Sequence, residues 1–220
     1  MVIAYPVRTG LYVNLTNRCP CACEFCLRKN GPGIYGSGDL WLDHEPSVEE
    51  VIAAVDCLLL GSADAGKSGL GNAAAEGGSR YGELVFCGYG EPTERLGDLL
   101  AVARHVREVA PNLPIRINTN GLADLIHARA TAGDLKGLVD TVSISLNTPD
   151  ADEYFRICHP KFGPESYAAM LAYTKACAAV VPKVVMTVVD EPVTSKANQE
   201  KCRAIAESLG ATLRVRPFES

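Results

Sequence analysis

Four cysteines crowd into eight residues near the start of this 220-residue chain, directly after the apolar run 11–16. Three of them, Cys19, Cys23 and Cys26, have the spacing C-x3-C-x2-C, and an aromatic residue precedes the last one. Three thiolates this close on one loop can hold three corners of a [4Fe–4S] cluster, which normally takes four protein thiolates. Three ligands would leave one iron open for a small molecule.

This spacing resembles the cluster motif C-x3-C-x-aromatic-C of the radical S-adenosylmethionine (radical SAM) enzymes. The resemblance implies that Cys19, Cys23 and Cys26 hold a [4Fe–4S] cluster whose open iron binds S-adenosylmethionine (SAM). One electron from the cluster would cleave the SAM sulfonium, and the released 5′-deoxyadenosyl radical would abstract hydrogen from a substrate. The electron would come from an external donor of the flavodoxin or ferredoxin type. Phe25 would stack on the adenine ring, its alternative being a plain core aromatic.

A zinc site and a chance cysteine cluster are the alternatives for this loop. A structural zinc site with four cysteine ligands usually pairs two separated C-x2-C units, and no second unit follows here. Cys21 lies outside the three-cysteine spacing, and we interpret it as a spectator. A zinc-stabilised interaction module would be colourless, whereas an iron–sulfur protein is brown.

The composition is that of a single globular domain. Hydrophobic residues make up 47% and charged residues 21% of the chain, which is ordinary for such a domain. The net charge of -5 argues against bulk binding to nucleic acid or to an anionic membrane. No apolar run is long enough to span a bilayer, and residues 1–6 lack the layout of a signal peptide. Nine cysteines, an odd number, fit a reducing compartment, so we expect a cytoplasmic protein.

Short strands and helices alternate along the chain. The hydrophobic patterns predict strands at 11–16, 83–87, 115–119, 141–146, 183–189 and 211–218. They predict helices at 47–60, 96–110, 123–131, 164–180 and 195–209. This alternation is typical of an α/β fold with a parallel sheet and right-handed crossovers. Six units are too few for a closed eight-stranded barrel. An ordinary doubly wound sheet fits the pattern, whereas the resemblance implies an open partial (β/α)6 TIM-like barrel.

We expect one radical SAM domain over 1–220, with a flexible insertion at about 61–80. The insertion is rich in Gly, Ala and Ser and has few large apolar residues. Within it, 61–68 matches the phosphate-binding pattern G-x4-G-K-S. A working phosphate-binding loop needs a strand before it and a helix after it. A predicted helix precedes this one, so we interpret the match as chance.

A glycine-rich motif follows the second predicted strand. Gly88, Gly90 and Glu91 precede a proline, as in the "GGEP" motif of radical SAM enzymes, although Tyr89 replaces the first glycine of its commonest form. The glycines would let backbone carbonyls approach a ligand without an intervening Cβ. The resemblance implies that these residues contact the methionine amine of SAM. The alternative is a plain turn before a helix.

Polar residues also follow the third and fourth predicted strands. Asn118 and Asn120 belong to a "TNG" pattern that is similar to a cofactor site of the same family, although Asn-Gly is also a common turn. Serines alternate with aliphatic residues over 142–147, so one face of that strand is polar. The resemblance implies that Ser145 and Asn147 lie near the SAM ribose or sulfonium. A solvent-facing edge strand is the alternative.

The segment 156–161 gathers a thiol, an imidazole and two cations after the fourth predicted strand. A substrate-binding role for Cys158 or His159 is one hypothesis. A surface turn that ends at Pro160 is the interpretation we favour, because such loops are commonly only structural.

Two further stretches, 15–20 and 145–150, resemble the small radical SAM proteins labelled TatD-associated. More distantly, the chain is similar to the glycyl-radical-enzyme activases and to 7-carboxy-7-deazaguanine synthase. None of these resemblances names the substrate, which could be a protein glycine, a nucleobase or a small metabolite. The competing class is a non-catalytic iron–sulfur electron carrier or redox sensor. A carrier has no need for an amine-binding motif beside the cluster.

Overall fold

The structure is a computed structural model that describes residues 1–34, 36–61 and 79–218. The expected insertion at about 61–80 and the phosphate-loop-like match at 61–68 lie almost wholly outside the described residues. Of that stretch, the structure describes only Gly61, which ends a π-helical turn (Cys57–Gly61), and residues 79 and 80.

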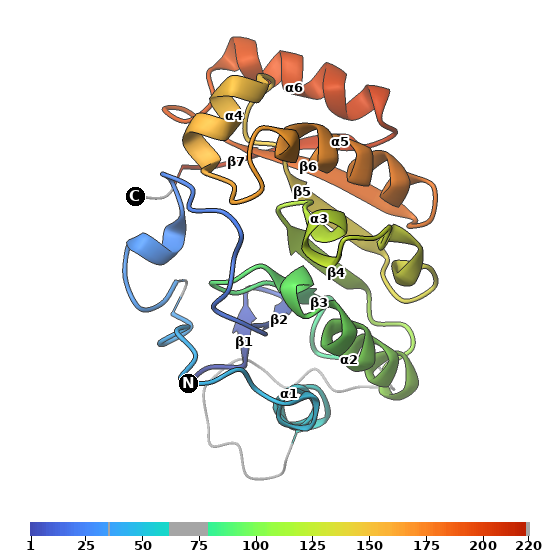
Figure 1. Ribbon diagram of the computed structural model, residues 1–220. Helices are drawn as coiled ribbons and strands as arrows, with labels where there is room; N and C mark the ends of the chain where they lie inside the picture. Colours follow the sequence, from blue (N-terminus) through green and yellow to red (C-terminus); the bar gives the residue numbers. More distant parts are fainter. Residues whose placement is uncertain (35, 62–78, 219–220) are drawn as a thin grey trace.

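The described residues contain one seven-stranded sheet whose strands follow the chain order, β1-β2-β3-β4-β5-β6-β7 (Figure 1). The strands are β1 (Ala4–Val7), β2 (Gly10–Val13), β3 (Glu83–Phe86), β4 (Ile115–Thr119), β5 (Thr141–Ser145), β6 (Lys183–Val189) and β7 (Thr212–Arg216). β1 pairs antiparallel with β2, and every later neighbour is parallel. The prediction of an α/β fold with a parallel sheet is therefore confirmed. β1 was missed, because Pro6 lies within it and proline is confined to edge strands.

Helices connect the parallel strands. They are α1 (Val48–Asp56), α2 (Leu96–Val109), α3 (Ala123–His127), α4 (Ala151–Cys158), α5 (Glu165–Ala178) and α6 (Lys196–Ser208). Short 3-10 turns lie at Leu27–Lys29, Pro92–Arg95 and Ala132–Leu135. Figure 1 shows α2, α3 and α5 along one side of the sheet, whereas the blue segment that follows β2 lies at the left of the view, away from them. No helix among these is both long and apolar enough to cross a membrane.

Two helices differ from the prediction. The helix expected at 123–131 ends at His127, because Ala128 adopts a left-handed conformation with φ of 50°. The helix α4 was not expected at all. It is short, and its N-cap is Asp150, whose carboxylate accepts a hydrogen bond from the Glu153 N–H at 2.8 Å.

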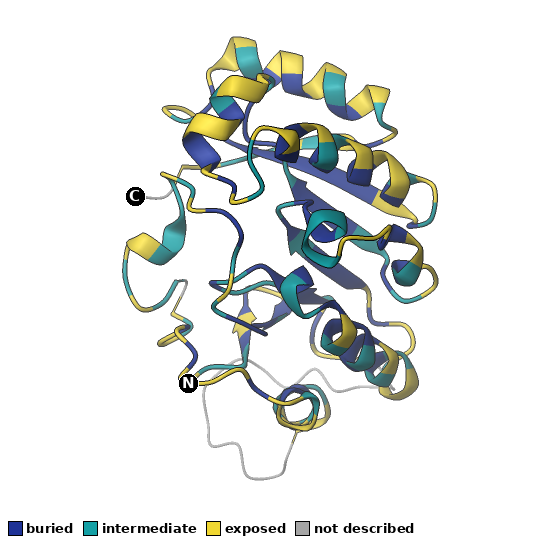
Figure 2. Ribbon diagram, in the orientation of Figure 1, coloured by how far each residue is buried: buried dark blue, intermediate teal, exposed yellow. Residues whose placement is uncertain are grey.

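The hydrophobic core lies on the helix-facing side of the sheet. Side chains at alternate positions of β5 and just beyond it, Val142, Ile144 and Leu146, are fully buried in the same cluster as residues of α2 and α5. Figure 2 shows the central strands mostly in the dark blue of buried residues and the outer sides of α5 and α6 in the yellow of exposed ones. The other face of β5 carries Ser143 and Ser145, which line cavities. The predicted alternation of polar and aliphatic faces is therefore confirmed.

Replacement of Ser47 by Ala tests the expected start of the first helix. The Ser47 hydroxyl accepts from the Glu50 N–H at 3.2 Å, and the Glu50 carboxylate accepts from the Ser47 N–H at 2.7 Å, which is a complete capping box. Ser47→Ala should lower the free energy of unfolding by about 1 kcal/mol, measured by urea titration. Ser208→Ala is the matched control, because that exposed hydroxyl only donates to a helical carbonyl. Equal losses in the two variants would contradict the capping role.

Candidate active site

One cavity of about 500 Å³ gathers all the site residues that the sequence predicted. These residues come from the C-terminal ends of β4 and β5 and from the loops after β2, β3, β4 and β5. They are Cys19, Cys23, Phe25, Cys26, Gly88, Gly90, Glu91, Asn118, Asn120, Ser145 and Asn147. The carboxyl ends of parallel strands meet at one edge of a sheet, which is where such folds place ligands. The structure thus brings these residues together, whereas the role of each one stays a prediction.

The cysteine loop (residues 17–26) docks on the C-terminal end of α4. The last carbonyls of a helix have no partner within it. Here the N–H of Ala22 donates to the Cys158 carbonyl at 3.0 Å, and the N–H of Glu24 donates to the Ile157 carbonyl at 3.0 Å. The helix end is therefore completed by the loop that carries the cysteines.

This docking corrects the interpretation of 156–161 as a surface turn. Cys158 is buried as the last residue of α4 and lines the same cavity as the cysteine loop. His159 is exposed, and its ring lies 3.4 Å from the Glu24 carboxylate. The interpretation failed because the helical pattern of α4 spans only two turns.

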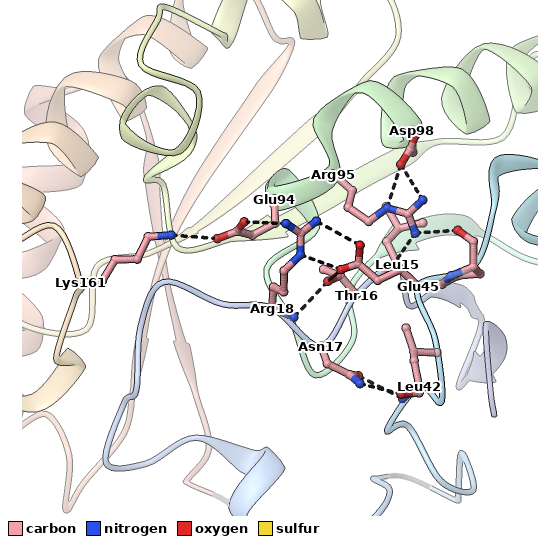
Figure 3. Close-up of polar contacts among 11 residues, drawn as sticks. Leu15, Thr16, Asn17, Arg18, Leu42, Glu45, Glu94, Arg95, Asp98 and Lys161 are labelled. Carbon is pink, nitrogen blue, oxygen red and sulfur yellow. Dashed lines mark hydrogen bonds and ion pairs between the residues drawn. The ribbon is translucent and has the colours of Figure 1, made fainter.

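An arginine from outside the cysteine loop fixes the chain where β2 ends. The Arg95 guanidinium donates to the carbonyls of Leu15 and Pro46 at 2.9 and 2.6 Å, and it pairs with Asp98 at 2.6 Å (Figure 3). Arg95 itself lies where the turn after β3 meets α2. One side chain therefore joins the ends of β2 and β3 to the segment before α1.

A set of ion pairs lies around the start of the cysteine loop (Figure 3). Arg18 pairs with Glu45 at 2.7 Å, and the same carboxylate accepts from the Thr16 hydroxyl at 2.6 Å. Glu94 lies 3.8 Å from Arg18 and 3.6 Å from Lys161. These partly exposed pairs orient the loop more than they stabilise the fold, because surface ion pairs contribute little free energy.

The glycines of the second motif are needed for packing. A Cβ on Gly88 would lie 2.0 Å from the Asn14 side-chain oxygen. A Cβ on Gly90 would lie 2.1 Å from the Thr16 carbonyl oxygen and 2.6 Å from that of Arg18. The sequence reasoning attributed these glycines to close approach of a ligand. The structure shows a second reason for them, because they let the motif lie directly against the chain that leads into the cysteine loop, and the role toward a ligand stays a prediction.

Glu91 is buried, and its carboxylate is fully used within the protein. One oxygen accepts from the Thr93 N–H at 3.1 Å and from the hydroxyls of Thr93 and Thr119, each at 2.7 Å. The other oxygen accepts from the Asn120 N–H at 2.7 Å. Burial raises the pKa of Glu91, and the hydrogen bonds from Asn120, Thr119 and Thr93 offset part of that rise. Glu91 therefore ties the motif after β3 to the motif after β4.

The thiols of the cavity influence one another. Hydrogen bonds from the Cys158 thiol and then the Cys21 thiol lower the pKa of Cys23, although burial opposes them. The side-chain nitrogen of Asn120 lies 3.9 Å from the Cys19 sulfur. Among the described residues, no three His, Cys, Asp or Glu side chains converge closely enough to hold a single metal ion. The fit to a [4Fe–4S] cluster rests on the donor set, because thiolates are the ligands that such clusters take.

No family model matches the chain. Over 156 residues it is 28% identical to a protein from Rhodococcus erythropolis named probable dual-specificity RNA methyltransferase RlmN, which covers 68% of this chain and 37% of that protein. The crystal structure of a radical SAM methyltransferase from Sphaerobacter thermophilus superposes on 97% of this chain and 56% of that one, with a TM-score of 0.62 and 20% identity. SuiB from Streptococcus suis superposes on 96% of this chain and 40% of that one, with a TM-score of 0.62 and 14% identity.

In sequence the chain is similar to these RNA methyltransferases, and in fold it is similar to solved radical SAM enzymes, which supports the predicted resemblance to the radical SAM superfamily. The likeness to solved structures shows the fold. The chain spans about a third of the length of the curated relatives, 37% and 32% of two of them.

The polar face of β5 continues into the cavity at Asn147. This residue is buried and has a left-handed backbone with φ of 65°. Its side-chain nitrogen lies 3.3 Å from the Cys158 sulfur, whereas its side-chain oxygen is buried without a partner. A buried acceptor that lacks a donor costs free energy. A ligand in the cavity could supply that donor, so the site fits a bound cofactor.

Sequence reasoning missed most of the charged wall of the cavity. Among the described residues, five arginines line it, namely Arg8, Arg28, Arg116, Arg214 and Arg216. The period-two pattern that identified the polar face of β5 also places Arg214 and Arg216 on one face of β7. That signal was present in the sequence and could have been used.

Replacement of Gly90 by Ala should displace the cysteine loop. The new Cβ would meet backbone atoms of Thr16 and Arg18, which cannot rotate away. We expect a lower unfolding temperature and a large loss of bound iron after reconstitution. Gly97→Ala is the matched control, because Gly97 lies in α2 with nothing within 4 Å of an added Cβ. That change should stabilise the protein by about 0.5–1 kcal/mol. Unchanged iron content in Gly90→Ala would contradict the packing argument.

Replacement of Glu91 by Gln should weaken the junction between β3 and β4. An amide keeps the shape of the side chain but turns one acceptor into a donor, which would face an N–H or O–H group. We expect the free energy of unfolding to fall by about 1–3 kcal/mol, measured by urea titration. Glu49→Gln, at an exposed position of α1, should change it far less. Similar stability of both variants would show that the Glu91 carboxylate does not hold the ends of β3 and β4 together.

Proposed function

We propose that this chain is a radical SAM enzyme domain that holds a [4Fe–4S] cluster and SAM in the cavity at the carboxyl ends of its strands. Cys19, Cys23 and Cys26 would ligate the cluster, with Cys21 as a spectator. When bound, the cluster supplies one electron that cleaves SAM into methionine and a 5′-deoxyadenosyl radical. In this proposal the parallel strands form the open partial (β/α)6 barrel of the superfamily.

The remaining predicted residues would hold SAM. The Glu91 carboxylate already accepts four hydrogen bonds, so the backbone around Gly88 and Gly90 is the better acceptor for the methionine amine. Asn147 offers an unpartnered buried oxygen to a donor of the cofactor. Phe25 lines the same cavity and would stack on the adenine.

The last cofactor contacts would come from the neighbouring strand ends. Asn118 lies in β4, Asn120 follows it, and Ser145 ends β5. All three line the same cavity as the cysteine loop. Their amide and hydroxyl groups suit the ribose hydroxyls and the carboxylate of SAM.

One observation carries the proposal. The three spaced thiols and the glycine-glutamate motif line one cavity, although more than 60 residues separate them in the chain. A non-catalytic electron carrier or redox sensor needs the thiols but not the second motif. The electron would come from a flavodoxin- or ferredoxin-type donor in a reducing cytoplasm.

Formation of 5′-deoxyadenosine tests this function. The protein is reconstituted with iron and sulfide without oxygen, reduced with dithionite and given SAM. We expect 5′-deoxyadenosine from the wild type and none from Cys23→Ala, because loss of one ligand removes the reducible cluster. The nucleoside is measured by chromatography and mass spectrometry.

Two cysteine variants serve as controls. Cys21→Ala changes the same loop outside the three-cysteine spacing, and Cys57→Ala changes an exposed position beyond α1. Both should retain cluster and product. A protein that loads a [4Fe–4S] cluster but makes no 5′-deoxyadenosine would support the electron-carrier class. A colourless protein that binds zinc would overturn the proposal.

RNA methylation is a second candidate function. It is favoured by the match to proteins named RNA methyltransferases over 68% of this chain. It stands against the expectation of no bulk nucleic-acid binding, which rested on the net charge of -5. Transfer of a labelled methyl group from SAM to ribosomal or transfer RNA would support it, and Cys23→Ala should then abolish the transfer.

A further inference from the structure

The cavity is basic although the chain is acidic. Among the described residues, its wall carries five arginines and one carboxylate, that of Glu91. The whole chain has a net charge of -5. Charges of one sign in a cleft with low-dielectric walls concentrate ligands of the opposite sign. The cavity wall is therefore positively charged in a protein that is negatively charged as a whole, and such a wall favours an anionic ligand.

Two of the arginines already have partners. Arg116 forms a two-pronged ion pair with Glu83, with nitrogen–oxygen distances of 2.6 and 2.9 Å. Arg28 donates to the Cys21 carbonyl at 3.3 Å. It is also the arginine whose charge helps to lower the pKa of Cys23, so it serves the cysteine loop.

Arg214 and Arg216 have no such partner. Both lie on the cavity-lining face of β7, and no carboxylate of the described residues lies within ion-pair distance of either one. The Nε of Arg216 is buried without a hydrogen-bond acceptor. A desolvated guanidinium nitrogen without an acceptor is costly, which a bound anion would relieve.

The two side chains line the cavity beside Arg116. The charges of Arg116 and Arg216 act on Cys87, which follows β3, and offset part of the burial that raises its pKa. Desolvation and then the like charges of Arg116 and Arg216 lower the pKa of Arg214. Arg116, Arg214 and Arg216 therefore lie close enough in this cavity for their positive charges to repel one another. A second cavity of about 290 Å³ shares Arg116 and Arg214 with the first and adds Lys183 and Glu83, the partner of Arg116.

We propose that Arg214 and Arg216 bind a carboxylate or phosphate group of a small-molecule substrate inside this cavity. A guanidinium binds both groups through two parallel N–H donors. The cavity of about 500 Å³ has the size of a small-molecule site. The assignment of the anion to a substrate rests on the proposed radical SAM function, in which the cysteine-loop end of the cavity is taken by the cofactor.

Paired probes that differ in charge test this site. Glycerol phosphate is compared with glycerol, and glutarate with glutaramide, by calorimetric titration of the reconstituted protein that already holds SAM. The wild type should bind the anionic member of at least one pair and neither neutral member. Arg214→Gln with Arg216→Gln should weaken that binding by about ten-fold or more. Arg203→Gln, which removes an arginine paired with Glu200 on α6, should leave it unchanged.

Three readouts keep the outcomes apart. The unfolding temperature of each variant shows that it is folded, and the SAM dissociation constant of the double variant should stay within about two-fold of the wild type. A parallel loss of SAM affinity would overturn the proposal in favour of arginines that hold the SAM carboxylate. Equal anion binding by wild type and double variant would also overturn it. So would arginine-dependent binding of an oligoribonucleotide without binding of the small anions.

Failure of the radical SAM function has a separate signature, which is the absence of 5′-deoxyadenosine from the wild type. Anion binding by titration is measured without turnover. A protein that binds the anions through these arginines but makes no 5′-deoxyadenosine would keep the site and lose its assignment to a radical SAM substrate. That result would overturn the substrate part of the proposal alone.

Discussion

The buried carboxylate of Glu91 is the interaction on which the cavity depends. Taking a carboxylate out of water is costly unless its oxygens are hydrogen-bonded. Here four donors from three residues satisfy them, and the Glu91 N–H donates to the Arg18 carbonyl at 2.7 Å. One residue therefore joins the ends of β2, β3 and β4. The cysteines, the glycine motif and the asparagines can share a wall because these strand ends are held in register.

The parallel sheet divides its side chains between two environments. The helix-facing positions are aliphatic and form the core, whereas the opposite positions carry Ser143, Asn118, Thr187 and the arginines of β7. Polar groups such as these cannot form a dry interior, because each one needs a partner. The alternation of side chains along each strand therefore places aliphatic residues in the core and polar residues in the cavity wall. The chemistry of the cavity depends on which polar residue occupies each position of that wall.

Much of this arrangement could be predicted from the sequence. The cysteine spacing indicated the superfamily, and alternation of apolar patterns indicated the order of strands and helices. Contacts between distant segments could not be predicted. No local signal shows that Gly88 and Gly90 pack against Asn14 and Thr16, or that the Glu91 carboxylate is already saturated.

Short elements were the other failure. β1 has four residues and a proline, and α4 has eight residues, so neither has enough periods to stand out from a loop. Both elements form because of what they pack against. β1 pairs with β2 along its whole length, and the end of α4 is completed by the cysteine loop. Their stability comes from tertiary contacts, which a pattern within one short segment does not contain.

The end of α4 sets where the cysteine loop lies relative to the strands. The Cys158 carbonyl accepts the Ala22 N–H, and the Cys158 thiol lies beside Cys23 and 3.3 Å from the Asn147 side chain. One residue therefore contacts both a predicted cluster ligand and a predicted cofactor residue. The distance between those two groups is fixed by a helix that follows β5 and not by the cysteine loop itself. The position of the cysteines therefore depends on contacts with distant parts of the fold, although the cysteine motif itself lies within eight residues.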